Sequence, residues 1–168
     1  RDPQGDWSSD VCSSDLISSG VAMGFIVMGA LAGVELMLAQ ELQFVLGRTP
    51  LEAGIFLLPL MLASAVGGPL AGLALRLIGL RLIASLSLMV SSASLAALAF
   101  SSLHAEGVSI VVLLAALGLS LSFGWTASSV AIMSNTPIEK AGSAGALEAT
   151  SYDLGAGLGI TAFGILLA

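Results

Sequence analysis

The sequence predicts an all-α integral membrane protein with about five transmembrane helices. Of the 168 residues, 57% are hydrophobic and only 10% are charged, and the mean hydropathy is +1.03. A soluble domain carries about 25% charged residues, because its surface faces water. A chain this poor in charge has a surface that faces lipid, and about 20 apolar residues per span limit it to five or six spans. Long uncharged runs separated by short polar turns agree with that limit.

Residues 1–16 are predicted to be foreign to this fold. The eleven residues Asp6–Leu16 read as the translation of a sequencing-library adapter and join an apolar run abruptly. They lack the basic region of a signal peptide. A disordered polar tail is the alternative, and under both interpretations the native N-terminus is expected to be missing. The single cysteine, Cys12, lies in this stretch and excludes a disulfide framework.

Five long apolar runs, of which the second, third and fourth are uncharged, give the predicted spans. The first ends at Gly47, and Thr49 or Pro50 begins the second, with Glu52 placed where a carboxylate suits the helix dipole. Pro59 and Pro69 are expected to kink the second span. The predicted spans are residues 17–46, 53–75, 82–103, 108–133 and 144–168.

Basic residues predict the orientation of the spans. Arg76, Arg81 and Lys140 lie in turns on one side of the membrane, whereas the other side has only Arg48. Cytoplasmic loops carry an excess of Lys and Arg. The turns at 76–81 and 134–142 are therefore predicted to be cytoplasmic.

Two small-residue motifs predict close helix packing. Gly68–Gly72 and Gly155–Gly159 both have the GxxxG spacing, which allows two helix backbones to approach. Ordinary membrane packing and a seam for rocking motions both remain open for each pair.

Carboxylates inside the spans are the candidate functional groups. Glu148 and Asp153 lie in the fifth span, and Glu35 lies in the first. A charge at the centre of a spanning helix costs roughly 2.5–3.5 kcal/mol, which protonation or a watery cavity avoids. Both conditions suit a group that exchanges a proton for a cation. The alternatives are a snorkelling role for Glu148 and a structural role for Asp153.

Aromatic residues supply candidate contacts for an organic cation. Tyr152 lies four residues after Glu148, on the same helix face. With Trp125 it could offer ring faces to a cation. The alternative for both is anchoring at the membrane interface.

Several segments together carry a family resemblance. The runs Glu41–Gly47, Pro50–Gly54, Gly67–Gly72 and Glu148–Gly155 resemble the C-terminal half of the fourteen-span drug:proton antiporters of the major facilitator superfamily, the quaternary-ammonium and methyl-viologen resistance exporters above all. The resemblance implies a partial bundle of that superfamily, its ninth to thirteenth helices. It also implies that Glu148 and Asp153 act in proton coupling and cation recognition. A degenerate copy of the cytoplasmic loop motif would comprise Gly68, Gly72, Arg76, Gly79 and Arg81.

The function implied is proton-coupled export of lipophilic cationic drugs across the bacterial inner membrane. The expected partners are protons, organic cations, the lipid bilayer and the missing N-terminal half, with no cofactor, metal or nucleic acid. Ala149 stands where some relatives have a second acid, and residues 53–75 lack the acid that some relatives carry. The chain alone is expected to be inactive.

Enzymatic alternatives fit poorly. An intramembrane aspartyl protease needs two aspartates, and Asp153 is the only aspartate after residue 16. A zinc protease needs more than the single histidine. A non-catalytic helical scaffold, or a transporter of another substrate class, remains the alternative.

Overall fold

The structure is a bundle of long helices. This computed structural model describes residues 3–101 and 108–167, and within them it contains no strand. Two short elements accompany the long helices: the π-helix η1 (Glu41–Val45) and the 3₁₀ helix η2 (Ile138–Lys140). The predicted all-α class is confirmed. The long helices are α1 (Pro3–Gln40), α2 (Pro50–Ile78), α3 (Leu80–Phe100), α4 (Val108–Ser134) and α5 (Ala141–Leu167).

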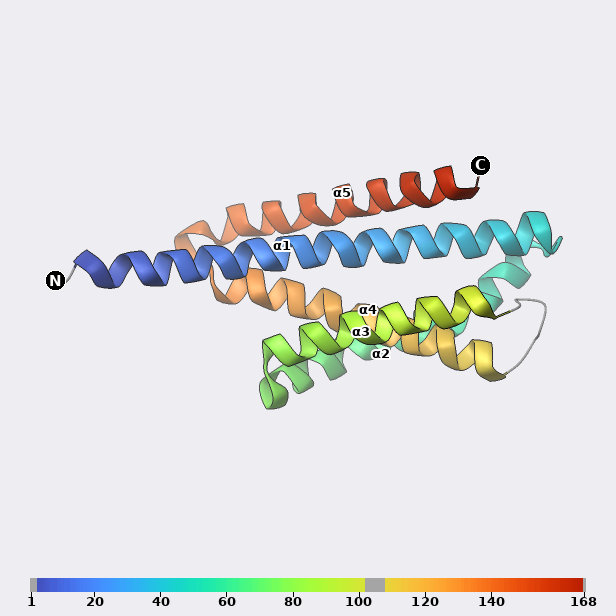
Figure 1. The fold of residues 1–168 in the computed structure, drawn as a ribbon, viewed down its shortest axis with the longest axis horizontal. Coiled ribbons are helices and arrows are strands. Elements are labelled where there is room, and N and C mark those ends of the chain that lie inside the picture. Colours follow the sequence, from blue (N-terminus) through green and yellow to red (C-terminus); the bar gives the residue numbers. More distant parts are fainter. Residues whose placement is uncertain (1–2, 102–107, 168) are drawn as a thin grey trace.

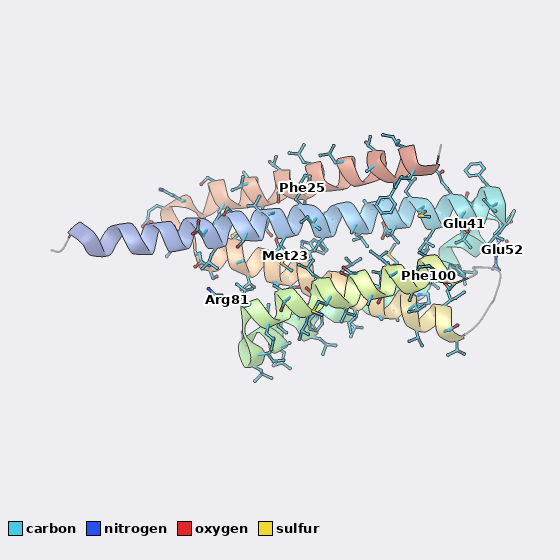
Figure 2. All side chains as sticks on the ribbon, viewed as in Figure 1. Met23, Phe25, Glu41, Glu52, Arg81 and Phe100 are labelled. Atoms are coloured by element: carbon cyan, nitrogen blue, oxygen red, sulfur yellow. The ribbon has the colours of Figure 1, made fainter. Side chains whose placement is uncertain are left out.

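The helices alternate in direction, as spans joined by short turns must. The turns between α2 and α3 and between α4 and α5 lie at the same end of the bundle (Figure 1). Figure 2 shows Arg81 at that end and Glu41 and Glu52 at the other. The two turns predicted to be cytoplasmic therefore share one side.

Helices α1 and α4 form the centre of the bundle. Helix α1 packs on α5 and α4, and α4 packs in turn on α2 and α3. Apolar side chains fill the interface among these helices. Leu60, Leu114 and Leu117 are among the most deeply buried, each with 0% of its surface exposed.

The junction between α1 and α2 follows the predicted stop and start signals. Helix α1 continues into η1, and Gly47 then takes a φ of 64°, which glycine adopts without strain. Thr49 caps α2 in a capping box: its backbone N–H donates to Glu52 Oε2 at 2.8 Å, and the Glu52 N–H donates to Thr49 Oγ1 at 3.4 Å. The predicted start of the second helix is confirmed.

Among the described residues, four helices are long and apolar enough to cross a membrane, and they correspond to four of the five predicted spans. They are Asp15–Val45, Pro50–Ile78, Leu80–Phe100 and Val108–Ser134. Helix α5 has 27 residues, about 40 Å, and is not among these four. Its spanning role stays a prediction. Residues 102–103 of the third predicted span, the turn at 104–107 and residue 168 lie outside the described residues.

The N-terminal stretch continues the first helix. Helix α1 begins at Pro3 rather than at the predicted start of the span, residue 17. Extending an existing helix costs far less than nucleating one, so a polar stretch joined to a long apolar helix can continue it. The foreign origin of residues 1–16 stays a prediction.

Only one of the two GxxxG motifs packs as predicted. A Cβ atom on Gly155 or Gly159 would collide with the α1 backbone at Phe25 or Gly29, so α5 and α1 cross at van der Waals distance. A Cβ atom on Gly72 would meet nothing within 4 Å, and one on Gly68 would reach only Ser122 Oγ on α4, at 4.0 Å. The prediction that Gly68–Gly72 forms a helix seam is wrong for the described part of the chain. Helix α2 instead meets α4 at Gly118, against the Leu60 backbone.

Candidate functional site

A polar cavity lies between α2, α4 and α5. Its volume is about 450 Å³, and it is open on one side. Glu148 on α5 is the only carboxylate among the described residues that line it. The lining residues are Ser64, Gly68, Ser122, Trp125, Thr126, Ser129, Glu148 and Tyr152.

Tyr152 holds the Glu148 carboxylate in place. The two residues lie one helical turn apart, and the Tyr152 hydroxyl donates to Glu148 Oε1 at 2.7 Å. The rings of Tyr152 and Trp125 pack edge to face, with their centroids 5.9 Å apart and their planes at 88°. One carboxylate and two aromatic rings thus share a wall of the cavity.

Behind Tyr152, three helices meet at one hydroxyl. Ser128 on α4 has 0% of its surface exposed, and its Oγ donates to the Gly20 carbonyl on α1 at 2.8 Å. The same Oγ lies 3.4 Å from the Tyr152 hydroxyl. Gly24 leaves room for this arrangement, since a Cβ there would collide with the Tyr152 ring.

Hydroxyl groups from α2 and α4 also line the cavity. Ser122 Oγ on α4 donates to the Ser64 carbonyl on α2 at 2.9 Å, and Thr126 Oγ1 donates to the Ser122 carbonyl at 2.9 Å. Ser64 donates to the Met61 carbonyl in its own helix. The oxygens of these hydroxyls keep lone pairs that can accept from water or from a ligand.

An apolar compartment adjoins the cavity. It has a volume of about 190 Å³, shares Ser64, Ser122 and Trp125 with the polar cavity, and extends toward α1. Its other walls are Val27, Met28, Leu31, Ala65 and Leu121. A carboxylate, two rings and an adjoining apolar space suit a ligand with one positive charge and an apolar body.

The structure gathers some of the predicted site residues and separates others. Glu148, Tyr152 and Trp125 come together, and Gly68 of the loop motif lines the same cavity. Asp153 is exposed on another face of α5, and Glu35 is half-buried on α1; neither lines this cavity. Arg76 and Arg81 are exposed.

The remaining glycine of the loop motif has a backbone role. Gly79 takes a φ of 93° at the turn between α2 and α3, a conformation that favours glycine. Nothing lies within 4 Å of a Cβ built there. Its neighbours Arg76 and Arg81 thereby project from the ends of two antiparallel helices.

Sequence reasoning missed the hydroxyl residues of the site. Ser122, Thr126, Ser128 and Ser129 fall on α4, and Ser64 falls on α2. The sequence does carry a signal for them, because hydroxyl residues are frequent in the segment Ser120–Ser129 of an otherwise apolar span. In a membrane, such hydroxyls either donate a hydrogen bond to a carbonyl of their own helix or form one with another helix. Only the packing of α4 shows that Ser122 and Ser128 bridge helices.

The described residues offer no metal centre. No group of three His, Cys, Asp or Glu side chains in the described part of the chain is placed to hold a metal ion. The fold and the site together define a multi-pass helical membrane protein with a polar cavity between its helices.

Comparison with known proteins agrees with this class. A methyl viologen resistance protein of Salmonella typhimurium is 47% identical over 152 residues, which are 90% of this chain and 31% of that protein. The tetracenomycin C resistance and export protein of Streptomyces glaucescens is 31% identical over 90% of the chain and 28% of its own length. The multidrug efflux pump of Mycolicibacterium smegmatis is 31% identical over 89% of the chain and 30% of its own length.

The chain is a homologue of efflux proteins of the major facilitator superfamily, so the predicted resemblance is confirmed. It spans about a third of the length of the curated relatives that it matches. No family model matches the chain. No solved structure matches it.

Proposed function

We propose that this chain is part of a proton-coupled exporter of lipophilic organic cations in the bacterial inner membrane. Within it, Glu148 binds either a proton or the cation, and the exchange couples proton entry to drug exit. Trp125 and Tyr152 contact the apolar body of the cation. Asp153, and Glu35 on α1, act in coupling on faces that the rest of the transporter covers.

The observation that carries this proposal is the single carboxylate in the aromatic-walled cavity. Glu148 has one fixed donor, Tyr152, and no basic residue lines the described cavity beside it. A carboxylate without a cationic partner can bind either a proton or a cationic ligand. The names of the relatives, which include resistance to methyl viologen, support a cationic substrate.

The energetics suit an antiporter. One proton entering down a potential of 100 mV releases roughly 2.3 kcal/mol, enough to sustain a substrate gradient. The second wall of the transport pathway would come from the rest of the protein, because substrate sites in such transporters lie between repeats. The chain alone is therefore expected to export nothing.

The test uses the full-length gene, expressed in a drug-sensitive bacterium. Proton-driven efflux of ethidium is measured for wild type, Glu148→Gln and Asp153→Asn, with membrane expression matched. Glu139→Gln is the control, since Glu139 is exposed on η2, outside the cavity. Glu148→Gln is expected to lose nearly all coupled efflux, and Glu139→Gln to retain it.

The alternatives give different results. Full efflux in Glu148→Gln would refute the assignment of the cavity as the coupling site. Loss of efflux in Asp153→Asn alone would move coupling to the outer face of α5. A full-length protein that exports no ethidium but forms stable bundles would support the scaffold alternative.

A further inference from the structure

The hydrogen bonds at Tyr152 differ sharply in length. The Tyr152 hydroxyl lies 2.7 Å from Glu148 Oε1 but 3.4 Å from Ser128 Oγ. An O–H···O bond has a usual length of about 2.7–2.8 Å. The single phenolic proton of Tyr152 is therefore donated to Glu148. Ser128 lies close enough to accept this proton but does not accept it in this arrangement.

Ser128 is prepared to accept that proton. Its own hydroxyl proton is used on the Gly20 carbonyl at 2.8 Å, so the lone pairs of its Oγ are free to accept from Tyr152. Ser128 is fully buried, so water does not compete for this position. A chain of hydroxyls thus leads from the cavity carboxylate on α5, through α4, to the backbone of α1.

We propose that Tyr152 and Ser128 form a hydroxyl switch that transmits the protonation of Glu148 to α1. When Glu148 is ionised, Tyr152 donates to it. When Glu148 takes up a proton, it no longer needs that donor, and Tyr152 donates to Ser128, which continues to donate to Gly20. The contact between α5, α4 and α1 then tightens. Apart from the O–H bond that forms when Glu148 takes up its proton, only hydrogen bonds change.

The switch rests on the proposed function of Glu148 and adds two positioning residues to it. Besides Glu148, no charged residue with a described side chain on the contributing helices lines the cavity. These residues are Asp15 and Glu35 on α1, Glu52 and Arg76 on α2, and Asp153 on α5. Helix α4 has no charged residue. Glu148 and Tyr152 are thus the titratable groups of the described cavity.

The test is the pH dependence of ethidium binding to the purified full-length transporter, followed by fluorescence polarisation. Wild type is expected to bind more tightly as the pH rises through one midpoint. Glu148→Gln is expected to lose that transition, and its persistence would overturn the proposed function together with the switch. The other variants test the switch alone.

Two substitutions are expected to move the midpoint in opposite directions. Tyr152→Phe removes a donor from the ionised carboxylate, so the midpoint rises by about half a pH unit or more. Ser128→Ala removes the acceptor that the protonated state uses, so the midpoint falls by a similar amount. Ser128→Cys keeps the size but accepts weakly, and is expected to lower the midpoint too. Ser120→Ala is the control, because this buried serine of α4 bonds only its own helix, at the Leu117 carbonyl.

A double-mutant cycle decides the matter. If the switch operates, adding Ser128→Ala to Tyr152→Phe changes nothing further, because Ser128 acts only through the Tyr152 hydroxyl. A midpoint in Ser128→Ala and Ser128→Cys equal to that of wild type would overturn the switch. Additive shifts in the double variant would overturn it as well, even with Glu148 confirmed as the coupling residue.

Discussion

At the scale of single residues, Trp125 is the side chain whose role is easiest to isolate. It lines both the polar cavity and the apolar compartment, and 46% of its surface is exposed. A cation resting against its ring would gain about 1 kcal/mol, or about fivefold in affinity.

We expect Trp125→Leu in the full-length transporter to raise the KM for ethidium efflux about fivefold. Trp125→Phe, which keeps a ring, should raise it less. Initial efflux rates from everted vesicles over a range of ethidium concentrations measure both. An unchanged KM in Trp125→Leu would mean that the cation does not rest on this ring.

The two acids of α5 show what sequence could and could not predict about the site. Glu148 and Asp153 are five residues apart, which turns them about 140° from each other around a helix, and the structure places only Glu148 in the cavity. Which of the two faces inward depends on where α5 meets α1. That crossing is set by Gly155 and Gly159, and its angular position cannot be computed from spacing alone.

At the scale of helices, the capping box at the start of α2 carries measurable stability. Thr49 and Glu52 satisfy each other's backbone N–H groups at a helix end that would otherwise leave them unpaired. Loss of such a cap costs about 0.5–2 kcal/mol.

Thr49→Ala should therefore lower the thermal unfolding midpoint of the purified chain in detergent, followed by circular dichroism. Thr161→Ala is the matched control, because Thr161 is exposed and bonds only the Gly157 carbonyl of its own helix. Equal midpoints for the two variants would contradict a stabilising cap.

The crossing of α1 and α5 gives a second prediction at this scale. Gly159→Ala places a methyl group against the Gly29 backbone and should destabilise the purified chain by about 1–3 kcal/mol. Gly157→Ala, two residues away, meets nothing within 4 Å and should be neutral or slightly stabilising, because alanine favours a helix. Thermal melts in detergent compare the two variants. Equal destabilisation would show that the helices do not cross at Gly159.

At the scale of the whole molecule, hydropathy and turn residues predicted the helices well. Long apolar runs predicted where the helices lie, and Gly47, Thr49 and Pro50 predicted the first junction, because these signals are local. Packing was harder to predict. The two GxxxG motifs have the same spacing, yet only the one in α5 makes close backbone contact with another described helix. Which helix face is covered depends on partners far along the chain.

The orientation in the membrane is a prediction of the same scale. With the basic turns in the cytoplasm, Ile138 lies inside the cell and Phe44 outside, and both side chains are largely exposed, at 90% and 84%. In a cysteine-free full-length background, Phe44→Cys should react with a membrane-impermeant maleimide in intact cells. Ile138→Cys should react only after permeabilisation. The reverse pattern would invert the assigned topology.

The close crossing of α1 and α5 also bears on the order in which the protein is made. Helix α1 leaves the ribosome before α2, α3 and α4, and α5 follows them all (Figure 1). Helices that enter the bilayer one by one associate afterwards, through close backbone contact rather than through a hydrophobic drive. The glycine face of α1 around Gly29 therefore lacks its α5 partner until α5 is synthesised. Docking of α5 completes the assembly of this segment and adds the wall of the cavity that carries Glu148.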